Sequence, residues 1–347
     1  MDIRYLHQQE KERSRELWEQ CFPEDSARFL DYYYQEKCRD NQILVLEGEQ
    51  GEILSMAHQN PYRIVMPAGE YVLDYIVGVA TDEKCRHQGY MRRLLTRLLS
   101  EQKARKNPFT FLMPASWKIY APFGFDWIFD QPDFQLNSLG KGLESYPAAD
   151  SPQEREEVRE WLGQWLSRRY QIYALRDAAY LDCQKKEIDS EYGEIFLLRD
   201  SASRLRGMEC FWGKAERERR FLYAEEPYLA ANPSAKPAIM ARILDLPEFM
   251  KSIRLKKRAD GEKQDPVEFI INLSDPVLEE NNGCFLVTVE ENGSRISLLG
   301  GSREMVPSLS IGALTQWLMG YGRAPKELTE EAEKIQTCGK IFLDEVV

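Results

Sequence analysis

A single glycine lies among basic and bulky residues in the segment 85–95, "CRHQGYMRRLL", where a helix is expected to begin. The apolar residues from this point recur at helical spacing on one face: Met91, Leu94, Leu95, Leu98 and Leu99. A helix N-terminus offers unpaired backbone N–H groups and the positive end of the helix dipole. Because Gly89 has no Cβ, the amides of residues 87–92 could close around a pyrophosphate.

Two common phosphate-binding motifs are excluded at this glycine. No Gly-Lys-Ser/Thr follows it, so the segment is not a nucleotide-hydrolase P-loop. The dinucleotide fingerprint G-x-G-x-x-G is also absent. The alternative interpretation is that Gly89 only turns the chain between a strand and a helix.

Strand-like segments flank the expected helix on both sides. Upstream, "YVLDYIVGVAT" (71–81) is rich in β-branched and aromatic residues and predicts a strand buried on both faces. Downstream, "PFTFLMPA" predicts another strand, and "EGEQGE" earlier in the chain predicts a hairpin turn. Strands that alternate with helices indicate an α/β domain.

Two further blocks follow the first. The second opens with a helix, "SPQEREEVREWLGQWLSRRY", for which Ser151 and Glu154 form a capping-box pattern, and continues with strands at "EIFLLRD", "RLRGMECFWGK" and "RRFLYAEE". The third follows a Pro- and Ala-rich connector, "EPYLAANPSAKP". It contains "GCFLVTVEENGSRISLL", a predicted hairpin with its turn at "ENG", and a helix in "LSIGALTQWLMGYG" that Gly320 or Gly322 could end.

Composition sets limits on location and partners. The 347 residues are 43% hydrophobic and 30% charged, as in ordinary soluble globular proteins, and no apolar run approaches the ~20 residues of a membrane span. The charged N-terminus is unlike a signal peptide, and seven scattered cysteines without a CxxC pair favour reduced thiols in a cytoplasm. Three histidines without ligand spacing argue against a metal site.

Charge indicates the kind of partner. A formal net charge of −11 disfavours nucleic-acid binding and suits a cationic small substrate. The short basic run "KSIRLKKR" (251–258) is expected to be a solvated surface rather than a nucleic-acid site.

The segment "VATDEKCRHQGYMRRLL" resembles the coenzyme-A motif of the GCN5-related N-acetyltransferase (GNAT) superfamily, R/Q-x-x-G-x-G/A at a strand–helix junction. Met91 departs from the motif, which usually has Gly or Ala there. Three other segments resemble the enhanced-intracellular-survival (Eis) acetyltransferases: "LMPASWKIYAPFGFDW" (112–127), "PAIMARILDLPEFM" (237–250) and "LSIGALTQWLMGYG" (309–322). This resemblance extends over nearly the whole chain.

The resemblance implies an α/β (α+β) chain of tandem GNAT-fold domains with mixed central sheets, followed by a sterol-carrier-protein-like α+β domain. The expected boundaries are 1–145 for the acetyl-CoA-binding GNAT domain, 146–235 for a degenerate GNAT-like domain and 236–347 for the sterol-carrier-like domain. The implied activity is acetyl transfer from acetyl-CoA, without a metal, to a primary amine of a cationic small molecule (aminoglycoside- or polyamine-like) or of lysine. The alternative is a catalytically silent module that binds acyl-CoA or lipid.

The resemblance also assigns the cofactor site. Backbone groups of Val79, Ala80 and Thr81 are expected to contact the pantetheine between two splayed parallel strands, and Ala115 and Ser116 to lie near the thiol. The pyrophosphate is expected to bind the segment Arg86, His87, Gln88, Gly89, Tyr90, Met91 and Arg92.

Two residues are assigned to the chemistry on the same basis. Tyr120 matches the family's general acid, which protonates the departing thiolate; the alternative is a packing tyrosine. Val347 takes the place of the family's C-terminal residue, whose α-carboxylate serves as base or holds the amine. The alternative is that the hydrophobic tail only attaches the third domain to the first. Related proteins form hexamers, so a homo-oligomer is expected, with no nucleic-acid or membrane partner.

Overall fold

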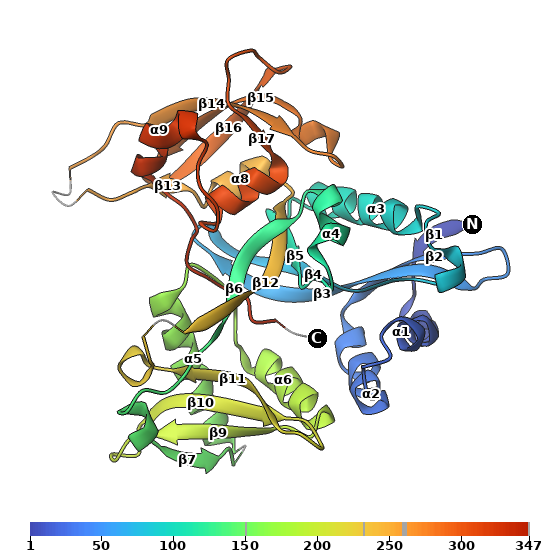
Figure 1. The fold of residues 1–347 in the computed structure, drawn as a ribbon, viewed down its shortest axis with the longest axis vertical. Coiled ribbons are helices and arrows are strands. Elements are labelled where there is room, and N and C mark those ends of the chain that lie inside the picture. Colours follow the sequence, from blue (N-terminus) through green and yellow to red (C-terminus); the bar gives the residue numbers. More distant parts are fainter. Residues whose placement is uncertain (150, 232, 259–261, 346–347) are drawn as a thin grey trace.

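The computed structural model describes residues 1–149, 151–231, 233–258 and 262–345. Three parts are visible in Figure 1: a central sheet in blue and teal, a green and yellow sheet on one side of it, and an orange and red sheet on the other.

The central sheet has nine strands and mixed direction. Its main path runs in the order β1 (Asp2–Tyr5), β2 (Gln42–Glu47), β3 (Ile53–Met66), β4 (Gly69–Thr81), β5 (Phe109–Leu112), β12 (Ser234–Ile243) and β6 (Asp126–Asp133). On this path only β4 and β5 are parallel neighbours. The strand predicted over residues 71–81 and the hairpin turn predicted at "EGEQGE" are confirmed.

Helices cover both faces of this sheet. The predicted amphipathic helix is confirmed as α3 (Tyr90–Ala104), whose Leu94, Leu95, Leu98 and Leu99 are fully buried. The helices α1 (Arg15–Cys21) and α2 (Ala27–Gln35) pack with the apolar side chains of the opposite face near β2–β4. A one-turn helix, α4 (Trp117–Tyr120), follows β5.

The second part is a four-stranded antiparallel sheet with two helices. The strands follow the order β11 (Glu218–Ala224), β10 (Leu205–Trp212), β9 (Glu194–Arg199) and β7 (Glu144–Pro147), and the helices are α5 (Pro152–Arg169) and α6 (Ala178–Ser190). The predicted N-cap is confirmed, since the Ser151 hydroxyl accepts a hydrogen bond from the backbone N–H of Glu154 at 3.2 Å.

The third part is another four-stranded sheet. It follows the order β16 (Gly293–Gly300), β15 (Gly283–Glu290), β14 (Val267–Ser274) and β17 (Ser308–Ser310), with α7 (Leu246–Met250), α8 (Ile311–Leu318) and α9 (Thr329–Lys334) around it. The "ENG" hairpin is confirmed as the β15–β16 connection. The helix predicted in "LSIGALTQWLMGYG" is α8, and Gly320, at a φ of 71°, follows its end.

The three parts are joined more closely than the sequence suggests. Residues 234–237, predicted as connector, begin β12, which lies between β5 and β6; the connector prediction is therefore wrong at this end. The expected boundary between residues 235 and 236 falls inside this strand. Near the other end of the chain, β19 (Ile341–Phe342) pairs with β8 (Ile172–Ala174), which pairs with β3. The division into three domains at residues 145 and 235 stays a prediction.

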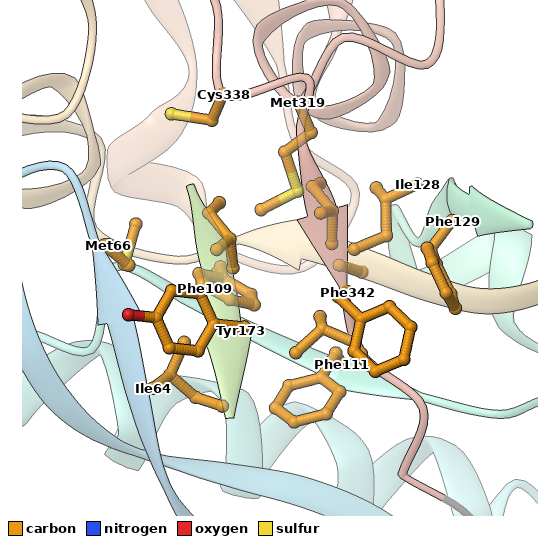
Figure 2. Close-up of a cluster of buried hydrophobic side chains, with 14 of the residues drawn as sticks. Ile64, Met66, Phe109, Phe111, Ile128, Phe129, Tyr173, Met319, Cys338 and Phe342 are labelled. Carbon is orange, nitrogen blue, oxygen red and sulfur yellow. The ribbon is translucent and has the colours of Figure 1, made fainter. Parts of the chain in front are cut away.

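One hydrophobic core runs through all three parts. Figure 2 shows Phe109 and Phe111 of β5 packed near Phe342 of β19 and Tyr173 of β8. Met319 and Cys338 of the third part belong to the same cluster. A continuous core of this kind removes apolar surface from water at every junction and favours one fixed arrangement of the parts.

Candidate active site

A cavity of about 800 Å³ opens between β4, the start of α3 and α4. Its base is the gap between the parallel strands β4 and β5, which are paired through Tyr75 and Phe111 and then diverge. Residues 76–81 line one side of the gap, and Met113 and Ala115 line the other. The splayed strands expected from the sequence are therefore present, and they leave backbone groups facing a ligand-sized space.

A β-bulge at Gly78 shapes the strand side of the cavity. The register of the β3–β4 ladder shifts so that Gly78 and Val79 both lie opposite Ala57. Gly78 has a φ of 57°, and a Cβ there would lie 2.4 Å from the Trp18 ring, so only glycine fits. The bulge frees backbone polar groups from the ladder beside the cavity. Sequence analysis missed this residue, although a glycine inside an apolar strand is a recognised sign of a bulge.

The start of α3 forms a concave arrangement of backbone amides. His87 and Gly89 both have left-handed backbone, with φ of 64° and 78°, and Gly89 is the N-cap of the helix. Alternating conformations of this kind turn successive N–H groups toward one point, and the first helical N–H groups lack intrahelical partners. A Cβ on Gly89 would meet no atom within 4 Å, so its side is open. Among the described residues, Arg86 and Arg92 pair with no carboxylate, and the Arg92 guanidinium lies 4.9 Å from the centre of the Phe123 ring. The loop is thus a cationic cradle suited to phosphate.

Tyr120 lies at the end of α4 and lines the same cavity. Its side chain is 8% exposed, and its hydroxyl forms no hydrogen bond within the described part of the chain. Burial raises the pKa of the phenol to about 12. The hydroxyl therefore keeps its proton at neutral pH and is free to donate it to a ligand.

Most of the predicted cofactor residues meet at this cavity. Those on its wall are Val79, Ala80, Thr81, Arg86, His87, Gly89, Tyr90, Met91, Arg92 and Ala115. Gln88 and Ser116 are not among the lining residues; the Gln88 side chain instead accepts a hydrogen bond from the Tyr90 hydroxyl at 2.8 Å. The structure groups these residues, while their contacts with a cofactor stay a prediction.

Acidic side chains that sequence analysis did not single out also line the cavity. Glu24 and Asp25 lie between α1 and α2. Burial raises the pKa of Asp25, and the Trp18 indole N–H, which donates to its carboxylate at 2.7 Å, acts in the opposite direction. No local motif marks these residues, because the fold of the first two helices brings them to the site.

The end of the described chain is buried between the first and second parts. We call Ile341–Glu345 the C-terminal seam; all five of its residues are buried. Asp344 accepts hydrogen bonds from Arg220 of β11 at 3.0 Å and from Gln131 of β6 at 2.7 Å. The apolar residues Ile341, Phe342 and Leu343 are buried as their types suggested, whereas the two acidic residues are held by ion pairs.

Glu345 is the last described residue and is fixed by two partners. The Arg176 guanidinium lies 3.0 Å from its carboxylate, and the Tyr180 hydroxyl donates to it at 2.6 Å. Burial raises the pKa of Glu345, and the Arg176 charge partly offsets this. Val347, the predicted chemical residue, lies outside the described residues.

Other candidate groups have structural surroundings. His58 is fully buried among Trp18, Tyr33 and Tyr34, away from the lining of the cavity. All seven cysteines are free thiols. Among the described residues, no group of three or more His, Cys, Asp or Glu side chains could hold a metal ion. Within the same residues, no helix is long and apolar enough to cross a membrane.

Comparisons with known proteins agree with this geometry. Residues 2–128 match the acetyltransferase (GNAT) domain family, and residues 246–341 match the sterol carrier protein domain family. A search of curated proteins gave no significant match.

Solved structures share the fold along nearly the whole chain. A probable N-acyltransferase from Enterococcus faecalis aligns with a TM-score of 0.73 and 14% identity, covering 97% of this chain and 93% of that one. A GCN5-related N-acetyltransferase from Anabaena variabilis aligns with a TM-score of 0.68 and 16% identity, covering 97% and 94%. Eis1 from Mycobacterium abscessus aligns with a TM-score of 0.63 and 14% identity, covering 97% and 93%. The chain therefore carries an acetyltransferase domain of the GNAT family and a sterol carrier protein domain, and it shares the fold of these solved structures along nearly its whole length.

Proposed function

We propose that the protein transfers the acetyl group of acetyl-CoA to a primary amine of a cationic small molecule, aminoglycoside- or polyamine-like, or of lysine. The observation that carries the proposal is a single cavity with a cationic amide cradle at the start of α3, a gap between β4 and β5, and the protonated phenol of Tyr120. Pyrophosphate in the cradle and pantetheine in the gap would direct the thioester toward Tyr120.

The proposed reaction is a direct attack of the amine on the thioester. The neutral amine nitrogen bonds to the acetyl carbon, the C–S bond breaks, and Tyr120 donates its proton toward the departing sulfur. In this proposal, backbone N–H groups that the Gly78 bulge frees from the ladder stabilise the developing oxyanion. The nitrogen of the intermediate loses one proton and Tyr120 regains one through solvent, so the products are the amide and the free CoA thiol and the phenol is restored.

A cationic acceptor is supported by local charge. Glu24 and Asp25 line the cavity, and the whole chain has a net charge of −11. Carboxylates near the entrance attract a protonated amine before it binds. The bound amine must then lose a proton to a base or to water before it attacks, since an amine such as lysine has a pKa near 10.4.

The α-carboxylate of Val347 stays our proposal for this base or amine anchor. It is supported by the burial of the C-terminal seam, which brings the end of the described chain between the first and second parts. Adding one glycine after Val347 displaces the carboxylate without changing the seam. We expect turnover to fall severely with little change in thermal stability; full activity of the extended protein would remove the carboxylate from the mechanism.

The deciding experiment has two stages. Calorimetry measures acetyl-CoA binding, and a free-thiol assay then follows CoA release over a panel of spermidine, lysine and an aminoglycoside. We expect tight acetyl-CoA binding and amine-dependent thiol release. Binding without release for any amine would favour the second candidate, a silent acyl-CoA- or lipid-binding module, and absence of acetyl-CoA binding would contradict the acetyltransferase proposal.

We also propose, from the family resemblance, a cytoplasmic homo-oligomer, specifically a hexamer. Light scattering at micromolar concentration measures the mass directly. A mass near 40.5 kDa would be that of a monomer and would contradict this assignment.

A further inference from the structure

The basic run at residues 251–258 is not the solvated surface expected from the sequence. Ser252, Ile253 and Leu255 are buried, and Arg254 is half-buried. Arg254 and Leu255 form β13, which pairs with β18 (Ile335–Gln336). That prediction is therefore wrong for half of the run, because strand pairing turns alternate residues inward.

The run forms one wall of a second cavity, of about 690 Å³. Its wall includes Met66 at the end of β3, Tyr173 of β8, and Ser252, Arg254 and Lys257 of the basic run. Ser167 of α5 also lines it, so the three parts of the molecule meet here, and no residue of this wall lines the first cavity. The volume lies within the ~300–1,000 Å³ that small-molecule sites occupy.

Arg254 has an incomplete set of partners in this cavity. Its guanidinium donates one hydrogen bond, to the Pro67 carbonyl oxygen at 2.5 Å. Its Nε is shielded from solvent and has no partner, and no carboxylate lies within 4.0 Å of it among the described residues. A guanidinium has five N–H donors in a fork that matches a carboxylate or phosphate. The Arg254 N–H groups that have no partner therefore favour the binding of an anion in this cavity.

Two hydroxyl groups on the wall also lack partners. Ser252 is 3% exposed, and its Oγ forms no hydrogen bond. Leaving a buried hydroxyl unpaired is unfavourable, so a ligand that pairs with it gains affinity. Tyr173 is also buried, and its hydroxyl forms no hydrogen bond within the described chain. Figure 2 shows this hydroxyl pointing away from the phenylalanine rings, on the side of Met66.

The rest of the lining is partly apolar and could contact the nonpolar part of an organic anion. Val65, Met66 and Leu255 contribute apolar surface, and Lys257 adds positive charge. Glu262 and Glu291 are the acidic lining residues, and the Glu291 carboxylate already accepts a hydrogen bond from the Gln264 backbone N–H at 3.0 Å.

We propose that this second cavity binds a small organic anion, a carboxylate or phosphate monoester with an apolar body. Arg254 holds the anionic group, the Ser252 and Tyr173 hydroxyls donate to it, and the apolar wall covers the body. The site is separate from the acetyl-CoA cavity and does not depend on the acetyltransferase proposal. Because it joins the three parts, its ligand stabilises their arrangement.

The test is isothermal titration of the full chain with phenyl phosphate, benzoate and inorganic phosphate, each with and without acetyl-CoA. We expect saturable one-to-one binding of at least one organic anion, unchanged by acetyl-CoA. The comparison of phenyl phosphate with benzoate identifies the anionic group, and inorganic phosphate measures the contribution of the apolar body. Absence of saturable binding at millimolar concentration, or binding that acetyl-CoA abolishes, would overturn the proposal.

Variants assign the binding to this wall. We expect Arg254→Met to weaken binding at least tenfold and Ser252→Ala to weaken it several-fold. The matched control is Arg295→Met, since Arg295 is an exposed arginine of β16, in the same third part of the molecule, that is paired with Glu290 at 2.6 Å and does not line the cavity. If Arg254→Met fails to fold, Ser252→Ala still decides, because it removes only an unpaired hydroxyl. Unchanged affinity in the folded variants would contradict the assignment.

Discussion

The Arg86–Arg92 loop and the C-terminal seam are built in opposite ways. In the loop, backbone amides are the groups available to a ligand. The surface is open there, and Gly89 carries no side chain that could block it. In the seam, the interactions are made by side chains. Asp344 and Glu345 are buried and form ion pairs with Arg220 and Arg176, respectively. The first region exposes backbone groups that can bind a ligand, whereas the charged side chains of the second are paired with one another. Changes in the loop should therefore affect binding, and changes in the seam should affect stability.

The largest expected effect is on chemistry alone. Tyr120→Phe removes the proton donor but keeps the ring, which packs against Phe125 at 6.0 Å between centroids. We expect turnover to fall by about 10²–10⁴, the usual contribution of general acid catalysis, with acetyl-CoA affinity and melting temperature unchanged. Stopped-assay turnover, calorimetry and thermal unfolding measure the three quantities. Turnover near that of the wild type would show that Tyr120 only packs.

The next effect, in the seam, is on stability. Arg220→Met leaves the Asp344 carboxylate buried without its cation, although Gln131 and Tyr223 still donate to it. Breaking a buried pair on one side costs about 3–5 kcal/mol, so urea unfolding should shift strongly. The matched control is Arg217→Met, since the Arg217–Glu194 pair is half-exposed on both sides and should contribute less than about 1 kcal/mol. Equal losses in both variants would contradict the contrast.

A smaller effect is expected on cofactor binding at the loop. Gly89→Asp places a carboxylate where pyrophosphate would bind, and we expect acetyl-CoA affinity to fall more than tenfold. Gly51→Asp is a matched control, because Gly51 also has a left-handed φ, 84°, and open space for a Cβ, yet lies away from the cavity. Both variants carry the same backbone strain, so calorimetry separates strain from charge. Similar affinities in the two variants would remove the loop from the cofactor site.

The same contrast explains what the sequence could predict. The helix after Gly89, the strand over 71–81 and the Ser151 cap follow from local patterns of periodicity and capping. The Tyr120 assignment required a family resemblance, because an isolated tyrosine has no local signature. The position of β12 between β5 and β6 could not be predicted, since strand order depends on contacts between residues more than 100 positions apart. Arg254 was misread for the same reason: its burial depends on β18 and the β3–β4 turn, which are distant in sequence.

The smallest expected effect concerns pH and the buried histidine of the first part, His58. His58 is fully buried beside Trp18 and Tyr33, and burial lowers its pKa to about 3, with the Lys11 charge acting in the same direction. In the unfolded chain its pKa returns to about 6.5, so below that pH the unfolded state binds a proton that the folded state refuses. Stability is therefore present above pH 6.5 and is lost as the pH falls toward 3.

Between pH 7.5 and 5.5 this one group should cost about 1.4 kcal/mol of unfolding free energy, the equivalent of one pKa unit. Other ionisable groups also contribute to the pH dependence of stability, so the effect of His58 is measured as a difference between two proteins. Urea unfolding at both pH values gives the loss of unfolding free energy for the wild type and for His58→Gln. We expect the wild type to lose about 1.4 kcal/mol more than the variant. Equal losses would mean that His58 takes up its proton in the folded state. That would require a water molecule or an acidic group beside its Nε2, and among the described residues Nε2 is buried without a hydrogen-bond partner.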